Sequence, residues 1–140
     1  MENELFVKKV YSAAYMLTGK EKNACEMALL AIGKTVNNLI PNDQITESMF
    51  KSTMIELVNT FLNTQNICYN KNDDINNTQK ALLRLSPIRR ATIIWKDVLG
   101  FKIDDSIPAV NHTRQELLRE LSLGRRELKN VLQIKTGMKR

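Results

Sequence analysis

The sequence predicts an all-α protein made of two small helical lobes. Its 140 residues include only five glycines and three prolines. Apolar residues recur three and four positions apart in several segments, which is the period of a helix with one buried face. One stretch, residues 63–77, is rich in Asn and Asp and has no sustained period, so it predicts a linker. The length suits either one domain or two small helical ones.

Three amphipathic helices are predicted before the linker. The first ends at Thr18-Gly19, and its apolar face comprises Leu5, Phe6, Val10, Ala13, Ala14 and Leu17. The second runs from about Glu21 through Leu39, ahead of Pro41, and its apolar positions include Ala24, Met27, Ala28, Ala31, Ile32 and Val36. The third runs from about Thr46 to Thr64 and buries Phe50, Met54, Leu57, Phe61 and Leu62. Such helices can share one core, so we expect a three-helix bundle.

A four-helix domain is predicted after the linker. Gly100 can end a helix that contains Ile93, Ile94, Trp95 and Val98, in which Trp95 is expected to be a core residue. Asp104 and Asp105 provide acidic first-turn residues for a short helix that carries Ile107 and Val110. A longer helix then starts at Thr113, because Thr113 and Glu116 match a capping box.

The longer helix has a buried stripe and a basic face. Leu117, Leu121, Gly124 and Leu128 recur at spacings of four, three and four, whereas the residues of the helix that fall off this stripe include four arginines. A short helix, a polar turn and a longer basic helix form the layout of a helix-turn-helix, whose second helix enters the major groove of DNA. An ordinary helical bundle with a solvated basic face explains the same pattern equally well.

The net charge of +6 is unevenly distributed. Residues 1–70 contain six Lys and Arg against seven Asp and Glu, whereas residues 71–140 contain fifteen against eight. Phosphate binding requires such a basic half, although a basic protein-docking surface would have the same composition.

The C-terminal half resembles the promoter −35-reading region of bacterial sigma factors, especially the extracytoplasmic-function group. The matching motifs are Leu85-Ser86-Pro87 with Arg90, Asp97 to Phe101, Asp104 to Ile107, and Leu121 to Leu128. Ser106 and Ile107 differ from the isoleucine and alanine of the family, Pro108 interrupts the short helix, and Glu116-Leu117 replace a threonine-valine pair. The basic face and the resemblance together predict DNA contacts by Arg114, Gln115, Leu118, Arg119, Ser122, Arg125, Arg126 and Lys129. Arg114, Gln115 and Arg119 are expected at base edges, and Arg125, Arg126 and Lys129 at phosphates.

The N-terminal half is similar to the sigma region that holds core RNA polymerase. Ala14 to Gly19 match the end of the first helix of that region, and Ala24 to Met27 match the start of its polymerase-binding helix. The resemblance implies polymerase contacts by Glu26, Leu29, Leu30 and Lys34, with Leu29 where a glutamine is usual. Without the resemblance, Glu26 is simply a solvated residue that the helix dipole stabilises.

The third helix departs most from the family. Its counterpart carries aromatic and basic residues that recognise and open the −10 element, since a separated strand needs stacking platforms in a positive groove. Between Phe50 and Asn70 this chain offers one basic residue, Lys51, and the aromatics Phe50, Phe61 and Tyr69. Phe50 and Phe61 are expected in the core, so we expect poor promoter opening.

The resemblance implies three segments: a region 2-like polymerase-binding domain at residues 1–66, a linker at 67–76, and a region 4-like DNA-binding domain at 77–140. It implies a cytoplasmic transcription initiation protein whose partners are core RNA polymerase and promoter DNA. The alternative is a regulatory module that binds an anti-sigma protein or another sigma subunit without promoter opening.

Catalysis, cofactors and membrane insertion are not expected. His112 is the only histidine, Cys25 and Cys68 form no C-x-x-C pair, and the glycines form no phosphate-binding loop. No segment has the length or the composition of a signal peptide or a bilayer span.

Overall fold

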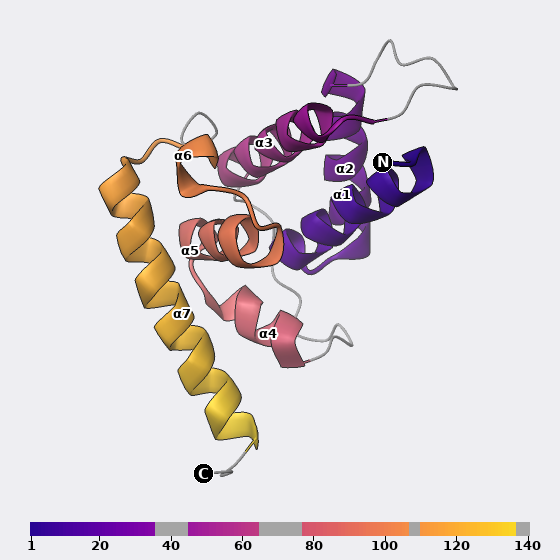
Figure 1. Cartoon of the computed structure of the whole chain (residues 1–140). Helices are drawn as coiled ribbons and strands as arrows, with labels where there is room; N and C mark the ends of the chain where they lie inside the picture. Colours follow the sequence, from indigo (N-terminus) through magenta and orange to yellow (C-terminus); the bar gives the residue numbers. More distant parts are fainter. Residues whose placement is uncertain (36–44, 65–76, 107–109, 137–140) are drawn as a thin grey trace.

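The computed structural model describes residues 1–35, 45–64, 77–106 and 110–136 (Figure 1). Every regular element within these ranges is helical, which confirms the predicted all-α class. The elements are α1 (Asn3–Thr18), α2 (Glu21–Thr35), α3 (Glu47–Asn63), α4 (Asn77–Arg84), α5 (Pro87–Ile93), the π-helical turn η1 (Ile94–Val98), α6 (Ile103–Ser106) and α7 (Arg114–Thr136).

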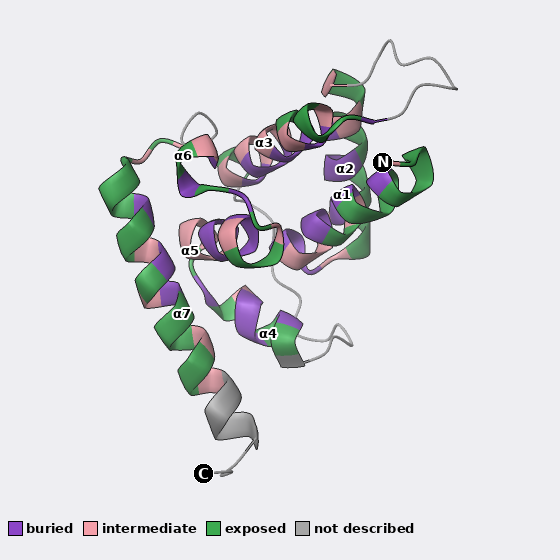
Figure 2. Ribbon diagram, viewed as in Figure 1, coloured by how far each residue is buried: buried purple, intermediate pink, exposed green. Residues whose placement is uncertain are grey.

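Helices α1, α2 and α3 pack together at one side of the molecule, as the spacing of their apolar residues predicts (Figures 1 and 2). The side chain of Thr46 accepts a hydrogen bond from the backbone N–H of Met49 at 3.1 Å, so it caps α3 where the sequence predicts its start. Leu5 is exposed, so its assignment to the buried face of α1 was wrong. The predicted extension of the second helix to Leu39 lies outside the described residues.

The predicted N-terminal and C-terminal lobes are in direct contact, and their buried residues form one hydrophobic cluster. An aromatic chain crosses between them: Phe6 packs edge-on against Phe50, Phe50 against Phe101, and Phe101 against Trp95, with ring centroids 4.8–6.2 Å apart. Ion pairing between Lys51 of α3 and Asp105 of α6, at 3.0 Å, crosses the same boundary. The division into domains at residues 66–77 stays a prediction.

Arg90 connects the C-terminal ends of α1 and α4. Its guanidinium donates hydrogen bonds to the carbonyl oxygens of Leu17 at 2.6 Å, Leu82 at 3.0 Å, Leu85 at 2.9 Å and Leu83 at 3.3 Å. Carbonyl groups at a helix C-terminus carry partial negative charge, which offsets the burial of this cation. Burial lowers the pKa of Arg90 to about 10, so the side chain is still charged at neutral pH.

Gly19 and Gln79 complete the junction between α1 and α4. Gly19 ends α1 with a φ of 73°, a conformation that favours glycine, and a Cβ atom there would lie 2.6 Å from a methyl group of Leu83. Gln79 donates hydrogen bonds from its amide to the carbonyl oxygens of Tyr15 and Met16, at 3.2 and 3.0 Å. Glycine therefore both ends α1 and lets α4 approach it closely.

The segment before α7 differs in part from its prediction. Trp95 is almost completely buried, as predicted, and donates a hydrogen bond to the carbonyl of Lys102 at 2.7 Å. The backbone widens to a π-helical turn at η1, which the sequence did not predict, and the chain then passes through Gly100 into α6. Val110 lies in a bend and not in the short helix to which it was assigned, while Ile107 and Pro108 are outside the described residues.

Candidate nucleic-acid interface

The first turn of α7 is fixed by the capping box that the sequence predicts. The backbone N–H of Glu116 donates to the hydroxyl of Thr113 at 3.2 Å, and the N–H of Thr113 donates to the carboxylate of Glu116 at 2.8 Å. These reciprocal bonds satisfy two N–H groups that the helix itself leaves unpaired. The start of the helix is therefore set by its own sequence.

The buried stripe of α7 faces α5 and the core, as predicted. Leu117 and Leu121 are almost fully buried, Gly124 is buried and Leu128 is half-buried (Figure 2). A Cβ atom on Gly124 would lie 3.1 Å from Ile93 and 3.6 Å from the Cβ of Arg89. This glycine therefore permits the close approach of α5 and α7, and a larger residue would force one of these neighbours to move.

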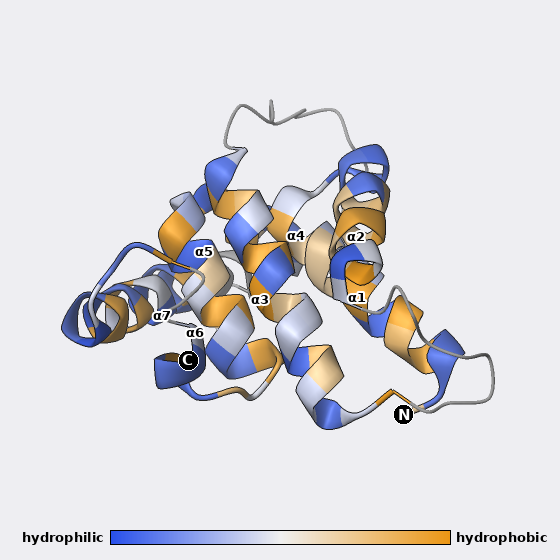
Figure 3. Ribbon diagram, turned by 90° about the horizontal axis from the view of Figure 1, so that it is seen from above, coloured by the Kyte–Doolittle hydropathy of each residue, from blue (hydrophilic) through white to orange (hydrophobic). Residues whose placement is uncertain are grey.

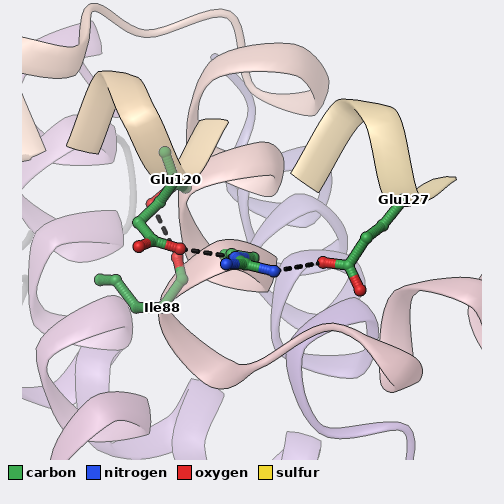
Figure 4. Close-up of polar contacts among 5 residues, drawn as sticks. Ile88, Glu120 and Glu127 are labelled. Atoms are coloured by element: carbon green, nitrogen blue, oxygen red, sulfur yellow. Dashed lines mark hydrogen bonds and ion pairs between the residues drawn. The ribbon is translucent and has the colours of Figure 1, made fainter. Parts of the chain in front are cut away.

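Arg89 of α5 holds α7 from one side. Its Nε donates to Glu120 and its Nη1 donates to Glu127, each at 2.6 Å. The two glutamates are seven residues apart, so they project from the same side of the helix, two turns apart. Figure 4 shows Glu120 and Glu127 extending toward the same group from successive parts of α7. The single positive charge of Arg89 offsets one of the two negative charges of these carboxylates, so their repulsion of an anionic partner is reduced.

The opposite edge of α7 is held by two further ion pairs. Arg125 forms a bidentate pair with Asp97 of η1, at 2.9 and 2.6 Å, and Arg114 donates to Asp104 of α6 at 2.8 Å. Arg114 and Arg125 are eleven residues apart, about three helical turns, so they lie on the same edge of the helix. The hydrogen bond from Arg125 lowers the pKa of Asp97, so this carboxylate is ionised at neutral pH.

All eight predicted DNA-contacting residues of α7 are exposed: Arg114, Gln115, Leu118, Arg119, Ser122, Arg125, Arg126 and Lys129. They form the outer face of α7, which lies along one side of the molecule (Figures 1 and 3). Within the described residues, no carboxylate pairs with Arg119, Arg126 or Lys129. Their contacts with DNA stay a prediction, and the charge that is free to meet a phosphate lies mainly on these three side chains.

The predicted polymerase contacts lie together on the outer side of α2. Glu26, Leu29, Leu30 and Lys34 are all exposed and recur at helical spacing. The side chains of Leu29 and Leu30 are 66% and 57% exposed, the largest values among the exposed large apolar side chains of the described residues. Lys34 lies 3.7 Å from Glu56 of α3. This surface of α2 therefore consists of two exposed leucines with an acidic residue, Glu26, on one side and a basic residue, Lys34, on the other.

The sequence did not predict the partners of the α7 arginines or the role of Arg89. Asp97, Asp104 and Arg89 were unassigned or assigned only to their own helices. His112 lies in the turn before α7, and its buried Nδ1 has no hydrogen-bond partner among the described residues.

No group of His, Cys, Asp or Glu that could hold a metal ion occurs within the described ranges. The described helices also include none that is long and apolar enough to cross a membrane.

The chain is similar in structure to the sigma factor RpoE of Bartonella quintana, in a co-crystal structure with the anti-sigma factor NepR. The TM-score is 0.61, the sequences are 16% identical, and the match covers 91% of this chain and 92% of RpoE. The fold is sigma factor-like. No protein-family model matches the sequence. A search of curated proteins found no match either.

Proposed function

We propose that this chain is a sigma-like transcription initiation protein that docks on core RNA polymerase through α2 and reads duplex promoter DNA through α7. In this proposal Glu26, Leu29, Leu30 and Lys34 contact polymerase, and the outer face of α7 contacts the −35 element. The chain is not proposed to act as an enzyme, and its site of action is the bacterial cytoplasm.

The single observation that carries the proposal is the arrangement of α7. A capping box sets its start, a buried stripe seats it, and Arg119, Arg126 and Lys129 point away from the core without an ion-pair partner in the described residues. A helix held rigidly on one side, with a basic face on the other, is what a major groove accommodates. The similarity to a sigma factor over most of the chain supports the same reading.

The exposed leucines of α2 support polymerase docking. Leu29 and Leu30 are adjacent and each is more than half exposed, so together they offer apolar surface for a partner to cover. Because the polymerase-binding helix of the sigma family is the one that α2 resembles, core polymerase is the proposed partner. Burial of each leucine side chain at an interface would contribute about 1.5–3 kcal/mol to the free energy of binding.

A pull-down with core RNA polymerase tests the proposal. We expect the full chain to retain polymerase, and the double variant Leu29→Ala/Leu30→Ala to lose at least tenfold in affinity. The control is Leu5→Ala/Val7→Ala on α1, which removes two other exposed apolar side chains and should bind like the parent chain. If the parent chain does not bind polymerase, or both double variants lose affinity equally, the docking proposal is wrong.

A second function is favoured by α3 and by the nature of the structural neighbour. Phe50 and Phe61 are buried, so α3 has no exposed aromatic side chain among its described residues. RpoE was crystallised with an anti-sigma factor. A sigma-like module that binds an anti-sigma protein or another sigma subunit needs no promoter-opening residues. Binding of such a partner by a chain that retains neither polymerase nor DNA would favour this alternative.

A further inference from the structure

Two of the arginines on α7 are already bound to carboxylates of the same chain. Arg125 and Arg114 lie along one edge of α7, next to η1 and α6, where Asp97 and Asp104 meet them. In the Arg125 pair, Nε and Nη2 donate to the two carboxylate oxygens of Asp97, and guanidinium also binds phosphate in this bidentate way. About half of the Arg125 side chain and three-fifths of the Arg114 side chain stay exposed, so an incoming phosphate can reach both groups.

We propose that Asp97 and Asp104 compete with DNA phosphates for Arg125 and Arg114, and that Asp97 thereby limits sequence-independent DNA binding by α7. The inference rests on the proposed reading of duplex DNA. Each carboxylate provides what a phosphate would provide, an anionic pair of oxygens at the same guanidinium. A phosphate must displace that carboxylate before it can bind the arginine. The free energy lost with the Arg–Asp pair reduces what the Arg–phosphate contact contributes to DNA affinity.

The arginines of α7 should therefore contribute unequally to DNA binding. Arg119 and Arg126 meet no carboxylate in the described part of the chain, so they contribute to DNA binding in full. Arg114 and Arg125 contribute only where the DNA geometry favours them over Asp104 and Asp97. Because phosphate contacts carry no sequence information, restraining two of them lowers affinity for random DNA and for a matched site alike. Asp97 is therefore a residue that limits the affinity of α7 for DNA of any sequence without itself touching the DNA.

The salt dependence of binding measures the effect directly. The logarithm of the binding constant falls with the logarithm of salt concentration, with a slope that grows by about 0.9 for each phosphate neutralised. Asp97→Asn keeps the shape of the side chain and removes its charge. On a short duplex of random sequence, we expect this variant to steepen the slope by about 0.9. Its affinity should then fall about 3.5-fold more than that of the parent chain between about 50 and about 200 mM salt.

Asp105→Asn is the matched control. Asp105 neighbours Asp104 on α6, but it pairs with Lys51 of α3 and not with α7. The variant makes the same change in net charge without releasing an arginine of α7. We expect its salt slope to match that of the parent chain, whereas Asp104→Asn should steepen the slope like Asp97→Asn. Because Asp104 is well exposed, its variant reports on the effect without threatening the fold.

The double variant Asp97→Asn/Arg125→Ala completes the test. It should lose the steeper slope, while Arg125→Ala alone should change the slope little, since Arg125 is bound to Asp97 in the parent chain. Equal slopes for Asp97→Asn and Asp105→Asn would overturn the inference, and so would weaker DNA binding by Asp97→Asn in a chain that still melts cooperatively. If the parent chain binds no DNA at low salt, the proposed function itself fails. If the parent chain binds DNA and its binding constant falls with salt, but Asp97→Asn leaves the salt slope unchanged, only this inference fails.

Discussion

Helices α3 and α7 occupy the positions where the sigma resemblance expects DNA contacts, and they expose opposite kinds of surface. The two aromatic residues of α3, Phe50 and Phe61, are 6% and 4% exposed, and its one basic residue, Lys51, pairs with Asp105. Helix α7 directs Arg119 and Arg126 outward. The comparison teaches that the basic surface proposed to read duplex DNA is concentrated in one helix, α7. A surface that could hold a separated strand is missing from α3.

The largest expected effect concerns promoter opening. Stacking of a base on an aromatic side chain contributes roughly 1–3 kcal/mol of binding free energy, and α3 has no exposed aromatic side chain on which a base could stack. We expect this chain with core polymerase to leave thymines near the −10 element of a linear duplex unreactive to permanganate. A template with a pre-melted bubble at the same position is the control and should react. Strong reactivity on the linear duplex would remove the contrast between α3 and α7.

The seating of α7 gives the next largest effect. Leu117→Ala should cost about 2–5 kcal/mol in the free energy of unfolding, because the side chain is almost fully buried where α7 meets the core. The adjacent Leu118 is exposed, so Leu118→Ala should change stability by no more than about 0.5 kcal/mol. Urea denaturation of the full chain measures both. Similar losses for the two variants would mean that the outer face of α7 has been assigned to the wrong side.

Substitutions on the outer face of α7 should affect DNA binding by about 1–3 kcal/mol. Arg119→Ala should relax sequence preference by that amount if its contact is bidentate to guanine. Arg126→Ala should lower the affinity for all DNA sequences alike and reduce the salt slope by about 0.9. Lys51→Ala on α3 should change neither quantity. Fluorescence anisotropy with matched and scrambled duplexes measures these effects, and an equal response to Lys51→Ala would show that α3 takes part in DNA binding.

The smallest expected effect is the pH dependence contributed by Asp97. The hydrogen bond from Arg125 lowers the pKa of the folded-state carboxyl below its ordinary value of 3.8. The pair therefore contributes stability that is fully present above about pH 4 and is lost as pH falls through the folded-state pKa. The difference in unfolding free energy between the parent chain and Asp97→Asn should be constant near neutral pH and shrink below about pH 4. A difference that grows on acidification would contradict the ion pair.

Local features of α7 could be predicted from the sequence alone. The capping box joins residues three apart, and the stripe from Leu117 to Leu128 follows from helical periodicity, so neither depends on the rest of the fold. The same reasoning failed at Leu5, where periodicity placed a residue on the buried face although the structure leaves it 44% exposed. Near the end of a helix, burial depends on whether a neighbouring element reaches that far.

The partners of the α7 arginines could not be predicted, because they depend on tertiary contacts. Arg125 and Asp97 are 28 residues apart, and Arg114 and Asp104 are ten apart across a turn. Many carboxylates could pair with these arginines until the crossing of α5 and α7 at Gly124 sets the distances. The outward direction of Leu29 and Leu30 came only from the family resemblance, since apolar residues in a helix are more often buried.

The contacts of Arg90 and Gln79 have a consequence for a chain that is cut in two. Both side chains belong to the C-terminal half and bind carbonyl groups at the end of α1, and the aromatic chain from Phe6 to Trp95 adds an apolar surface that both halves share. Peptide-bond continuity between residues 66 and 77 is not needed for any of these contacts. Two separately produced fragments, 1–66 and 77–140, should therefore associate without a covalent link. Fragment complementation would thus be a property of this sequence, and Arg90→Met should weaken it.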